Sequence, residues 1–373
     1  MPKLRPWLVV TGLCLIYALW VAADDPLRLV SIGTRFSEAA AQENAGAEGY
    51  DGQFVYYIAR DPLTAEQFLD VPAYRFQRIL LPALAMPFPD DAIPFVLLAV
   101  NLIGLAVGTF IMERLLVEQG VGRWYALAYG LTLGTFGATR LSLTEPLAYG
   151  LALAGVWLAA RERPLLSAVL FALAALTKET ALVVAAGYGL YLLANRHWRD
   201  AVLFGVIALA PFIVWQIVLY THLGAFGVGS GGALATSFEI VPFMGVIRII
   251  TEGAFVALEV SGISQFLVII LTFSIVVGVF VLVPTIWGLK RVVIDFRARK
   301  VSLYTWLLLT TCLIMAFVPF STYREPVGIL RFIVGLQIAV LLYAGQQRNT
   351  RVLHNSMIWI FTVFFVVMSD FAG

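Results

Sequence analysis

The chain has 373 residues, of which 61% are hydrophobic and 13% are charged, and its formal net charge is +2. Soluble domains are typically about half apolar and a quarter charged, so this composition excludes a soluble globule. It predicts an all-α polytopic membrane protein, and we expect no nucleic-acid partner. The two cysteines lie in apolar runs and the three histidines lack ligand spacing, so we expect no disulfide framework and assign no metal ligands.

The first apolar run extends from Trp7 to Ala23, behind Lys3 and Arg5. It could be a cleaved signal peptide, or it could be a membrane span of about 17 residues. We favour a retained first helix with a cytoplasmic amino terminus, because the remaining spans are then oriented consistently and the basic flank stays inside.

The longest polar segment, residues 24–90, is acidic and is predicted to be the first outer loop. Two pieces of it, Gln53–Arg60 and Tyr74–Met86, look helical but too polar to cross a membrane. Arg75 and Arg78 are three residues apart and therefore share a helix face. We expect both pieces to lie along the outer interface as amphipathic helices.

Apolar segments predict about eleven transmembrane or re-entrant helices in a single integral membrane domain, 1–373. The connections between them are short and rich in Arg and Lys on one side, which predicts that this side is cytoplasmic. The outer side would carry the loops 24–90 and 224–262, so function would face outward. After the first run, the predicted spans are Ile93–Leu116, Trp124–Thr139, Leu147–Ala160, Leu165–Thr177, Thr180–Ala194, Ala201–Leu223, Ile263–Leu289, Val301–Phe320, Gly328–Ala344 and Ser356–Met368.

The run Leu165–Ala194 would be about 45 Å long as one helix, well beyond a ~30 Å hydrocarbon core. Folding it back at the Thr-Lys-Glu-Thr sequence gives a sunken hairpin with Lys178 and Glu179 at its tip. Charges at such depth are costly unless they are paired or line a watery cavity. Two interpretations stay open: mutual ion pairing of Lys178 with Glu179 or Glu145, or a charged pocket open to the outside.

Two further charged segments are predicted at the same side. Glu145 lies in the turn Arg140–Pro146, between two spans of marginal length. Arg331 lies several residues into an apolar helix and needs an anion, a carbonyl or water. Its guanidinium would suit a phosphate. The alternative is a surface pair of Arg324 and Glu325 with an Arg331 side chain that extends to the interface.

Asp51 lies in the first outer loop, where Gly49 and Gly52 bracket it and would leave its side chain uncovered. Tyr56 and Tyr57 follow, and their rings and hydroxyls could face a polar ligand. The alternative is that Asp51 only caps a short interfacial helix.

A carboxylate beside buried cations fits sugar transfer from a polyprenyl-phosphate donor, which needs a base and positive charge for the departing phosphate. Asp51 would be the base, and Glu145 would orient the base or acceptor or help to hold a divalent metal. The predicted phosphate-binding residues are Lys178, Arg331, Arg75 and Arg78. The predicted substrate-pocket residues are Gln53, Tyr56, Tyr57, Glu179, Tyr323 and Arg324.

Three short sequences carry a family resemblance: Tyr50-Asp51-Gly52-Gln53-Phe54, Thr144-Glu145-Pro146 and Thr177-Lys178-Glu179-Thr180. With the helical architecture, they make the chain resemble the GT-C superfamily, in particular bacterial relatives of PIG-V-type and dolichyl-phosphate-mannose-type mannosyltransferases. The resemblance implies a GT-C-like fold in the cytoplasmic membrane, a catalytic aspartate at Asp51, a polyprenyl-phosphate sugar donor and an inverting mechanism. Many members have paired acids here, whereas Gly52 and Gln53 follow Asp51, so a need for Mg²⁺ or Mn²⁺ stays open.

The acceptor could be a lipid, a glycan or a protein, and the sequence does not name the sugar. Two other classes of function remain. A transporter or flippase for a lipid-linked or anionic solute would use the Lys178 hairpin as a binding site of discontinuous helices. A structural subunit of a membrane assembly would keep the buried charges paired and inert.

Overall fold

The computed structural model describes residues 4–37, 49–232, 235–252, 271 and 273–372. Across these residues the fold is all-α, with 75% of residues in helices and no strand. Parts of the two predicted outer loops and of the predicted span Ile263–Leu289 lie outside the described residues, namely 38–48, 233–234, 253–270 and 272.

Four helical segments of the described chain are long and apolar enough to cross a membrane. A fifth candidate is a helix pair, α17 and α18, that is bent by 44°. The described residues therefore form an all-helical membrane protein with four or five candidate spans. The segments are α5 (Ile93–Glu118), α11 (Trp198–Leu223), η6 and α14 (Ser274–Leu282 and Val283–Ala298), Thr350–Phe371, and the pair α17 (Pro326–Phe332) and α18 (Val334–Gln346).

The predicted count of about eleven spans is wrong. Five apolar helices have only 14 to 16 residues. At 1.5 Å per residue they are about 21–24 Å long, shorter than a ~30 Å hydrocarbon core. Apolar composition alone did not separate a full span from a shorter apolar helix. The five are α1 (Pro6–Val21), α8 (Glu145–Ala159), α9 (Pro164–Thr177), α10 (Ala181–Ala194) and α15 (Leu303–Phe317).

The predicted span Trp124–Thr139 is also wrong, because the chain there is broken into short turns. The Thr135 hydroxyl donates to the carbonyls of Tyr129 and Gly130, at 2.6 and 3.1 Å. These side-chain bonds satisfy carbonyls that a continuous helix would have used. The turns are η4 (Arg123–Ala126), α6 (Leu127–Gly130), the π-helical η5 (Leu133–Gly137) and α7 (Ala138–Arg140).

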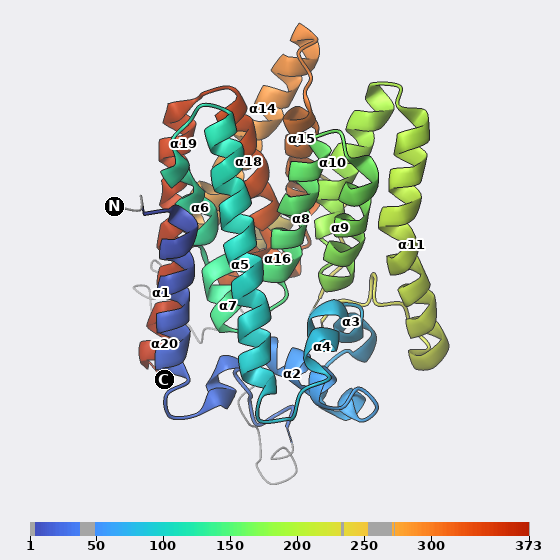
Figure 1. Cartoon of the computed structure of the whole chain (residues 1–373), viewed down its shortest axis with the longest axis vertical. Helices are drawn as coiled ribbons and strands as arrows, with labels where there is room; N and C mark the ends of the chain where they lie inside the picture. Colours follow the sequence, from blue (N-terminus) through green and yellow to red (C-terminus); the bar gives the residue numbers. More distant parts are fainter. Residues whose placement is uncertain (1–3, 38–48, 233–234, 253–270, 272, 373) are drawn as a thin grey trace.

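The long helices stand side by side, and the short helices α2, α3 and α4 lie together at one end of the molecule, the lower end in Figure 1. The helix α2 was expected to lie along an interface, but residues 52–59 are all buried, so it is part of the core. The second predicted interfacial helix is split into α3 and α4. The short elements are η1 (Pro26–Leu29), α2 (Gly52–Arg60), η3 (Ala65–Phe68), α3 (Pro72–Phe76), α4 (Leu80–Ala85), α12 (Met244–Glu252), α16 (Phe320–Arg324), α19 (Thr350–Ser356), η7 (Met357–Val363) and α20 (Phe364–Ala372).

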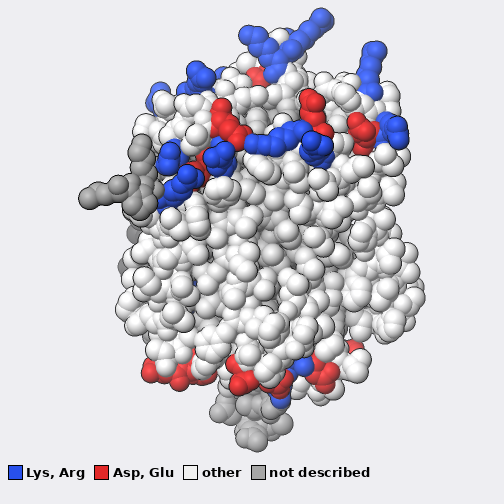
Figure 2. All heavy atoms as spheres, viewed as in Figure 1, with Lys and Arg blue, Asp and Glu red and all other residues white. Residues whose placement is uncertain are grey.

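Charged side chains lie at the two ends, with an uncharged band between them (Figure 2). Lys and Arg gather at the upper end, where the connections α8–α9, α10–α11, α14–α15 and α18–α19 lie. We call this the basic end. Asp and Glu dominate the opposite end, near α2, α3 and α4, which we call the acidic end.

The predicted hairpin at Lys178 is confirmed, because α9 ends at Thr177 and α10 begins at Ala181. Each helix is about 21 Å long, whereas the neighbouring α11 is about 39 Å long. The turn therefore stops well short of the acidic end of α11, and α3 and α4 lie below it (Figure 1). The Trp215 indole N–H of α11 donates to the Phe76 carbonyl at 2.9 Å, which fixes α3 there.

Candidate functional site

Asp51 lies at the start of α2, on a loop shaped by two glycines. Gly49 has a left-handed backbone, with φ of +69°. A Cβ atom on Gly52 would collide with the carbonyl of Leu141, so the loop packs directly on the Arg140–Pro146 turn. The Asp51 side chain makes no capping hydrogen bond to α2. The alternative of a simple helix cap is therefore not observed.

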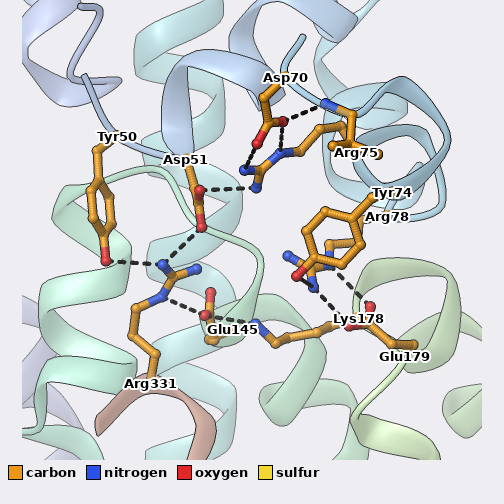
Figure 3. Close-up of polar contacts among 11 residues, drawn as sticks. Tyr50, Asp51, Asp70, Tyr74, Arg75, Arg78, Glu145, Lys178, Glu179 and Arg331 are labelled. Carbon is orange, nitrogen blue, oxygen red and sulfur yellow. Dashed lines mark hydrogen bonds and ion pairs between the residues drawn. The ribbon is translucent and has the colours of Figure 1, made fainter. Parts of the chain in front are cut away.

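Two arginines from distant segments hold the Asp51 carboxylate (Figure 3). Arg75 Nη1 donates to Oδ1 at 2.9 Å, and Arg331 Nη1 donates to Oδ2 at 2.8 Å. Arg331 Nη1 also donates to the Tyr50 hydroxyl at 3.0 Å. The Asp51 side chain is 29% exposed, while the two arginine side chains are almost buried.

Glu145 is the first residue of α8 and its side chain is fully buried. Its Oε1 accepts from Arg331 Nε at 2.7 Å and from Lys178 Nζ at 2.8 Å. Its Oε2 has no hydrogen-bond partner. The predicted pairing of Lys178 with Glu145 therefore exists, and it continues through Arg331 to Asp51.

Two further ion pairs flank these contacts. Arg75 donates through Nε and Nη2 to both oxygens of Asp70, at 2.7 and 2.8 Å. Arg78 donates through Nε and Nη2 to both oxygens of Glu179, at 3.0 and 2.7 Å. Such two-point pairs fix the orientation of a guanidinium. We call the eight residues of these pairs the site cluster: Asp51, Asp70, Glu145, Glu179, Arg75, Arg78, Lys178 and Arg331.

A small pocket, partly open to solvent, lies beside the site cluster. Three guanidinium groups and a single carboxylate line it, together with an apolar wall of side chains from α2 and α4. Lys178, Glu145 and Glu179 support the lining from behind without contributing to it. The lining residues are Asp51, Phe54, Val55, Ile58, Arg75, Arg78, Pro82, Leu143, Thr144 and Arg331.

Asp51 and Asp70 are both held as anions. Burial disfavours their charged forms, but the guanidinium groups of Arg75 and Arg331 outweigh it and hold the pKa of Asp51 well below its usual range. Burial likewise opposes ionisation of Asp70, and the hydrogen bonds and charge of Arg75 lower its pKa. In this arrangement Asp51 is ionised at neutral pH but only weakly basic.

The structure places the other predicted pocket residues outside this lining. Gln53 Oε1 accepts from the Gly33 N–H at 3.0 Å and so holds the loop before α2. Tyr323 is fully buried, and its hydroxyl donates to the Met315 carbonyl at 2.8 Å. The Arg324 guanidinium lies 5.8 Å from the ring centre of Phe320.

Tyr56 and Tyr57 are buried within the hydrophobic core around α2. The Tyr57 ring stacks on Phe68 with centroids 4.5 Å apart. It faces a second pocket, and Asp51 is not part of that pocket's lining. That pocket is lined by Tyr57, Arg60, Asp61, Thr64, Gln67 and Phe68.

Sequence reasoning missed two members of the site. Asp70 was read only as part of an acidic loop, although it lies five residues before Arg75 and anchors it. Tyr74 was not singled out, but its hydroxyl accepts from Arg78 Nη2 at 2.6 Å. Spacing along residues 70–78 could have suggested both contacts, because the partners are five and four residues apart.

Arg140 is not part of the site cluster, although it belongs to the same turn as Glu145. Its Nε donates to Asp370 Oδ2 at 2.7 Å, its Nη2 contacts the other oxygen, and its Nη1 donates to the Ser31 hydroxyl at 2.9 Å. The Tyr17 hydroxyl also donates to Asp370. We call these four residues the Asp370 cluster.

Within the described residues, no three His, Cys, Asp or Glu side chains converge so that they could hold a metal ion. Asp51 is the single carboxylate of the pocket lining and three guanidinium groups surround it, so the residues present do not fit a divalent cation. Comparison of the chain with models of protein families, with curated proteins and with solved structures finds no match.

Proposed function

We propose that this protein is a membrane glycosyltransferase that moves a sugar from a polyprenyl-phosphate donor to an acceptor hydroxyl. The observation that carries the proposal is the pocket in which Asp51 faces three guanidinium groups beside an apolar wall. Guanidinium groups suit phosphate oxygens, and the apolar wall of Phe54 and Pro82 suits the start of a lipid chain. Asp51 supplies a carboxylate within reach of the same space.

In the proposed reaction, the acceptor oxygen attacks the anomeric carbon from the side opposite the phosphate. The bond from that carbon to the phosphate oxygen breaks, and its electron pair stays on the phosphate. The acceptor proton passes to Asp51, and the configuration at the anomeric carbon inverts. Arg75, Arg78 and Arg331 stabilise the charge that develops on the departing phosphate.

Glu145 and Lys178 act behind the pocket in this proposal. Glu145 Oε1 bridges Lys178 and Arg331, so it fixes the direction in which the Arg331 guanidinium points. Glu179 does the same for Arg78. The predicted phosphate-binding role therefore passes to the three arginines, and Lys178 becomes a positioning residue.

The proposed orientation follows from charge. Positively charged connections lie preferentially in the cytoplasm. The basic end would thus be cytoplasmic, and the pocket at the acidic end would face outward from the cytoplasmic membrane. A polyprenyl-phosphate donor in the outer leaflet would reach it without crossing the bilayer again.

Asp51→Asn in the full-length protein tests the proposal. Loss of a general base typically costs about 10²–10⁴ in rate, so we expect transfer of labelled sugar from polyprenyl phosphate to fall by that factor. Asp90→Asn is the matched control, because Asp90 pairs with Arg60 at the surface, away from the pocket. Unchanged transfer by Asp51→Asn, with a normal thermal unfolding profile, would contradict the proposed role of Asp51.

A transporter or flippase is the second candidate, and the short hairpin of α9 and α10 favours it. Discontinuous helices whose turn ends inside the protein are typical of solute sites in secondary transporters. Sealed vesicles separate the two candidates. Movement of a lipid-linked solute without a new glycosidic bond would support transport, and a new bond without such movement would support transfer.

A further inference from the structure

The proposed function requires Asp51 and a bound phosphate to share the same guanidinium groups. The carboxylate assigned as the base is held by two of the arginines assigned to the phosphate, Arg75 and Arg331. We propose that a phosphate group binds here by taking these two guanidinium groups away from Asp51, so that binding itself releases the carboxylate. The catalytic consequence rests on the proposed function, but the exchange of partners does not.

Each arginine is anchored independently of Asp51. Arg75 donates to Asp70 through Nε and Nη2, and only Nη1 reaches Asp51. Arg331 donates to Glu145 through Nε, and only Nη1 reaches Asp51. An exchange of partners therefore breaks one hydrogen bond per arginine, and both guanidinium groups stay in place for the incoming anion.

Burial distinguishes the carboxylate that can leave from those that cannot. The Asp51 side chain is 29% exposed, whereas that of Asp70 is 10% exposed and that of Glu145 is fully buried. A freed Asp51 can turn toward water or toward an acceptor hydroxyl. The two anchoring carboxylates have no such alternative, and releasing them would leave buried charges unpaired.

Charge in the lining favours the exchange. Three guanidinium groups face the pocket against one carboxylate, and the carboxylates that balance them, Asp70, Glu145 and Glu179, lie behind the lining, so a ligand in the pocket meets mainly positive groups. A phosphate brings at least one negative charge and several acceptor oxygens, and it can replace both hydrogen bonds that Asp51 gives up. Asp51 also interacts electrostatically with Tyr50 and with Arg78.

The exchange makes the base depend on the donor. Without phosphate, Asp51 is ionised but weakly basic, because two guanidinium groups stabilise its charge. With phosphate bound, those groups are shared with the ligand and the carboxylate regains basicity. An acceptor that arrives first would meet an unreactive site, which couples deprotonation of the acceptor to the presence of the donor.

Binding measurements on the full-length protein in detergent test the exchange. The probes are a polyprenyl monophosphate and inorganic phosphate, each titrated against wild type and Asp51→Asn. Removing the competing carboxylate should tighten phosphate binding by about tenfold, which corresponds to about 1.4 kcal/mol. A carboxylate that binds the ligand directly, or plays no part, would give weaker or equal binding in the variant, and that result would overturn the exchange.

Matched variants separate competition from a general change of charge. Asp90→Asn removes a surface carboxylate that pairs with Arg60 and should change the affinity by less than about twofold, as surface pairs contribute little. Asp51→Ala repeats the test with a second side chain in case Asp51→Asn folds poorly. Tightening as large in Asp90→Asn as in Asp51→Asn would contradict the proposal.

The two probes identify what the pocket recognises. Tightening with both probes shows that the phosphate itself displaces Asp51, and tightening with the lipid alone shows that the apolar wall is needed as well. Absence of binding by either probe, to wild type and variant alike, overturns the exchange. If the wild type transfers sugar but Asp51→Asn binds phosphate no more tightly, the exchange is overturned and the proposed function stands. If Asp51→Asn binds phosphate more tightly but the wild type transfers no sugar, the proposed function is overturned and the exchange stands.

Discussion

Two clusters of charged side chains link distant segments of this protein, and they differ in how completely their charges are enclosed. In the Asp370 cluster, Arg140 uses Nε, Nη1 and Nη2 on Asp370 and Ser31, and Tyr17 adds a further donor. The paired side chains are only 5% and 8% exposed. In the site cluster, the carboxylate of Asp51 is 29% exposed and lines a pocket.

This difference in exposure distinguishes a structural ion pair from a candidate ligand-binding site. A pair whose two side chains are almost fully buried and whose charged groups are bound within the protein holds segments together. A pair that borders a pocket, with a partly exposed carboxylate and arginines anchored elsewhere, can exchange partners with a ligand. Arg140 and Glu145 belong to the same turn, yet one joins the closed cluster and the other the open one.

The largest expected effect on stability is at the closed cluster. Asp370→Ala leaves the Arg140 guanidinium buried without its partner, and breaking a buried pair in this way typically costs about 3–5 kcal/mol. We expect a marked drop in the unfolding temperature, measured in detergent. Asp90→Ala is the control, since surface pairs contribute about 0–1 kcal/mol. Equal unfolding temperatures for both variants would contradict the closed nature of the Asp370 cluster.

The next effect is on phosphate binding at the open cluster. Arg331→Met removes a guanidinium that faces the pocket, and charge-assisted hydrogen bonds are worth about 1.5–3 kcal/mol. We expect polyprenyl monophosphate to bind roughly 10- to 100-fold more weakly, measured by titration in detergent. Lys178→Met removes a cation of the same cluster that does not line the pocket, so its effect should be below about threefold. A larger loss in Lys178→Met than in Arg331→Met would restore the original assignment of Lys178 to the phosphate.

A smaller effect is expected from pH. The folded pKa values of Asp51 and Asp70 lie below their unfolded values of about 3.9, so both stabilise the fold above that pH. As the pH falls through and below about 4, the unfolded chain takes up these protons first, and stability declines. The unfolding temperature should therefore fall less steeply with acidification in the double variant Asp51→Asn, Asp70→Asn. The same slope in wild type and double variant would contradict the paired state of these carboxylates.

Several features were predictable from the sequence because they depend on local length and charge. The hairpin at Lys178 follows from helix length, and the shared direction of Arg75 and Arg78 follows from their spacing. The convergence of Asp51, Glu145 and Arg331 was expected because charged residues inside apolar segments need partners.

Other features depend on contacts that sequence spacing does not encode. Asp370 is 230 residues from Arg140, so no local sequence pattern predicts their pairing. The number of spans was overestimated, because an apolar helix such as α9 satisfies composition without reaching the length of a bilayer core. The burial of α2 was missed because the loop before it packs on the carbonyl of Leu141.

The smallest expected effect is that of two Tyr→Phe substitutions, one at each cluster, which allow a direct comparison of the two clusters. Tyr50→Phe removes a hydroxyl that accepts from Arg331, and Tyr17→Phe removes one that donates to Asp370, with both rings retained. A single hydrogen bond contributes about 0.5–1.5 kcal/mol, so each change should be modest.

Tyr50→Phe should alter phosphate affinity about two- to tenfold with little change in unfolding temperature, because Arg331 keeps Asp51 and Glu145 as partners. Tyr17→Phe should lower the unfolding temperature and leave the affinity unchanged, because the residues of its cluster are not among those that line the pocket beside Asp51. If the two variants changed affinity and stability in the same proportion, the distinction between an open and a closed cluster would fail.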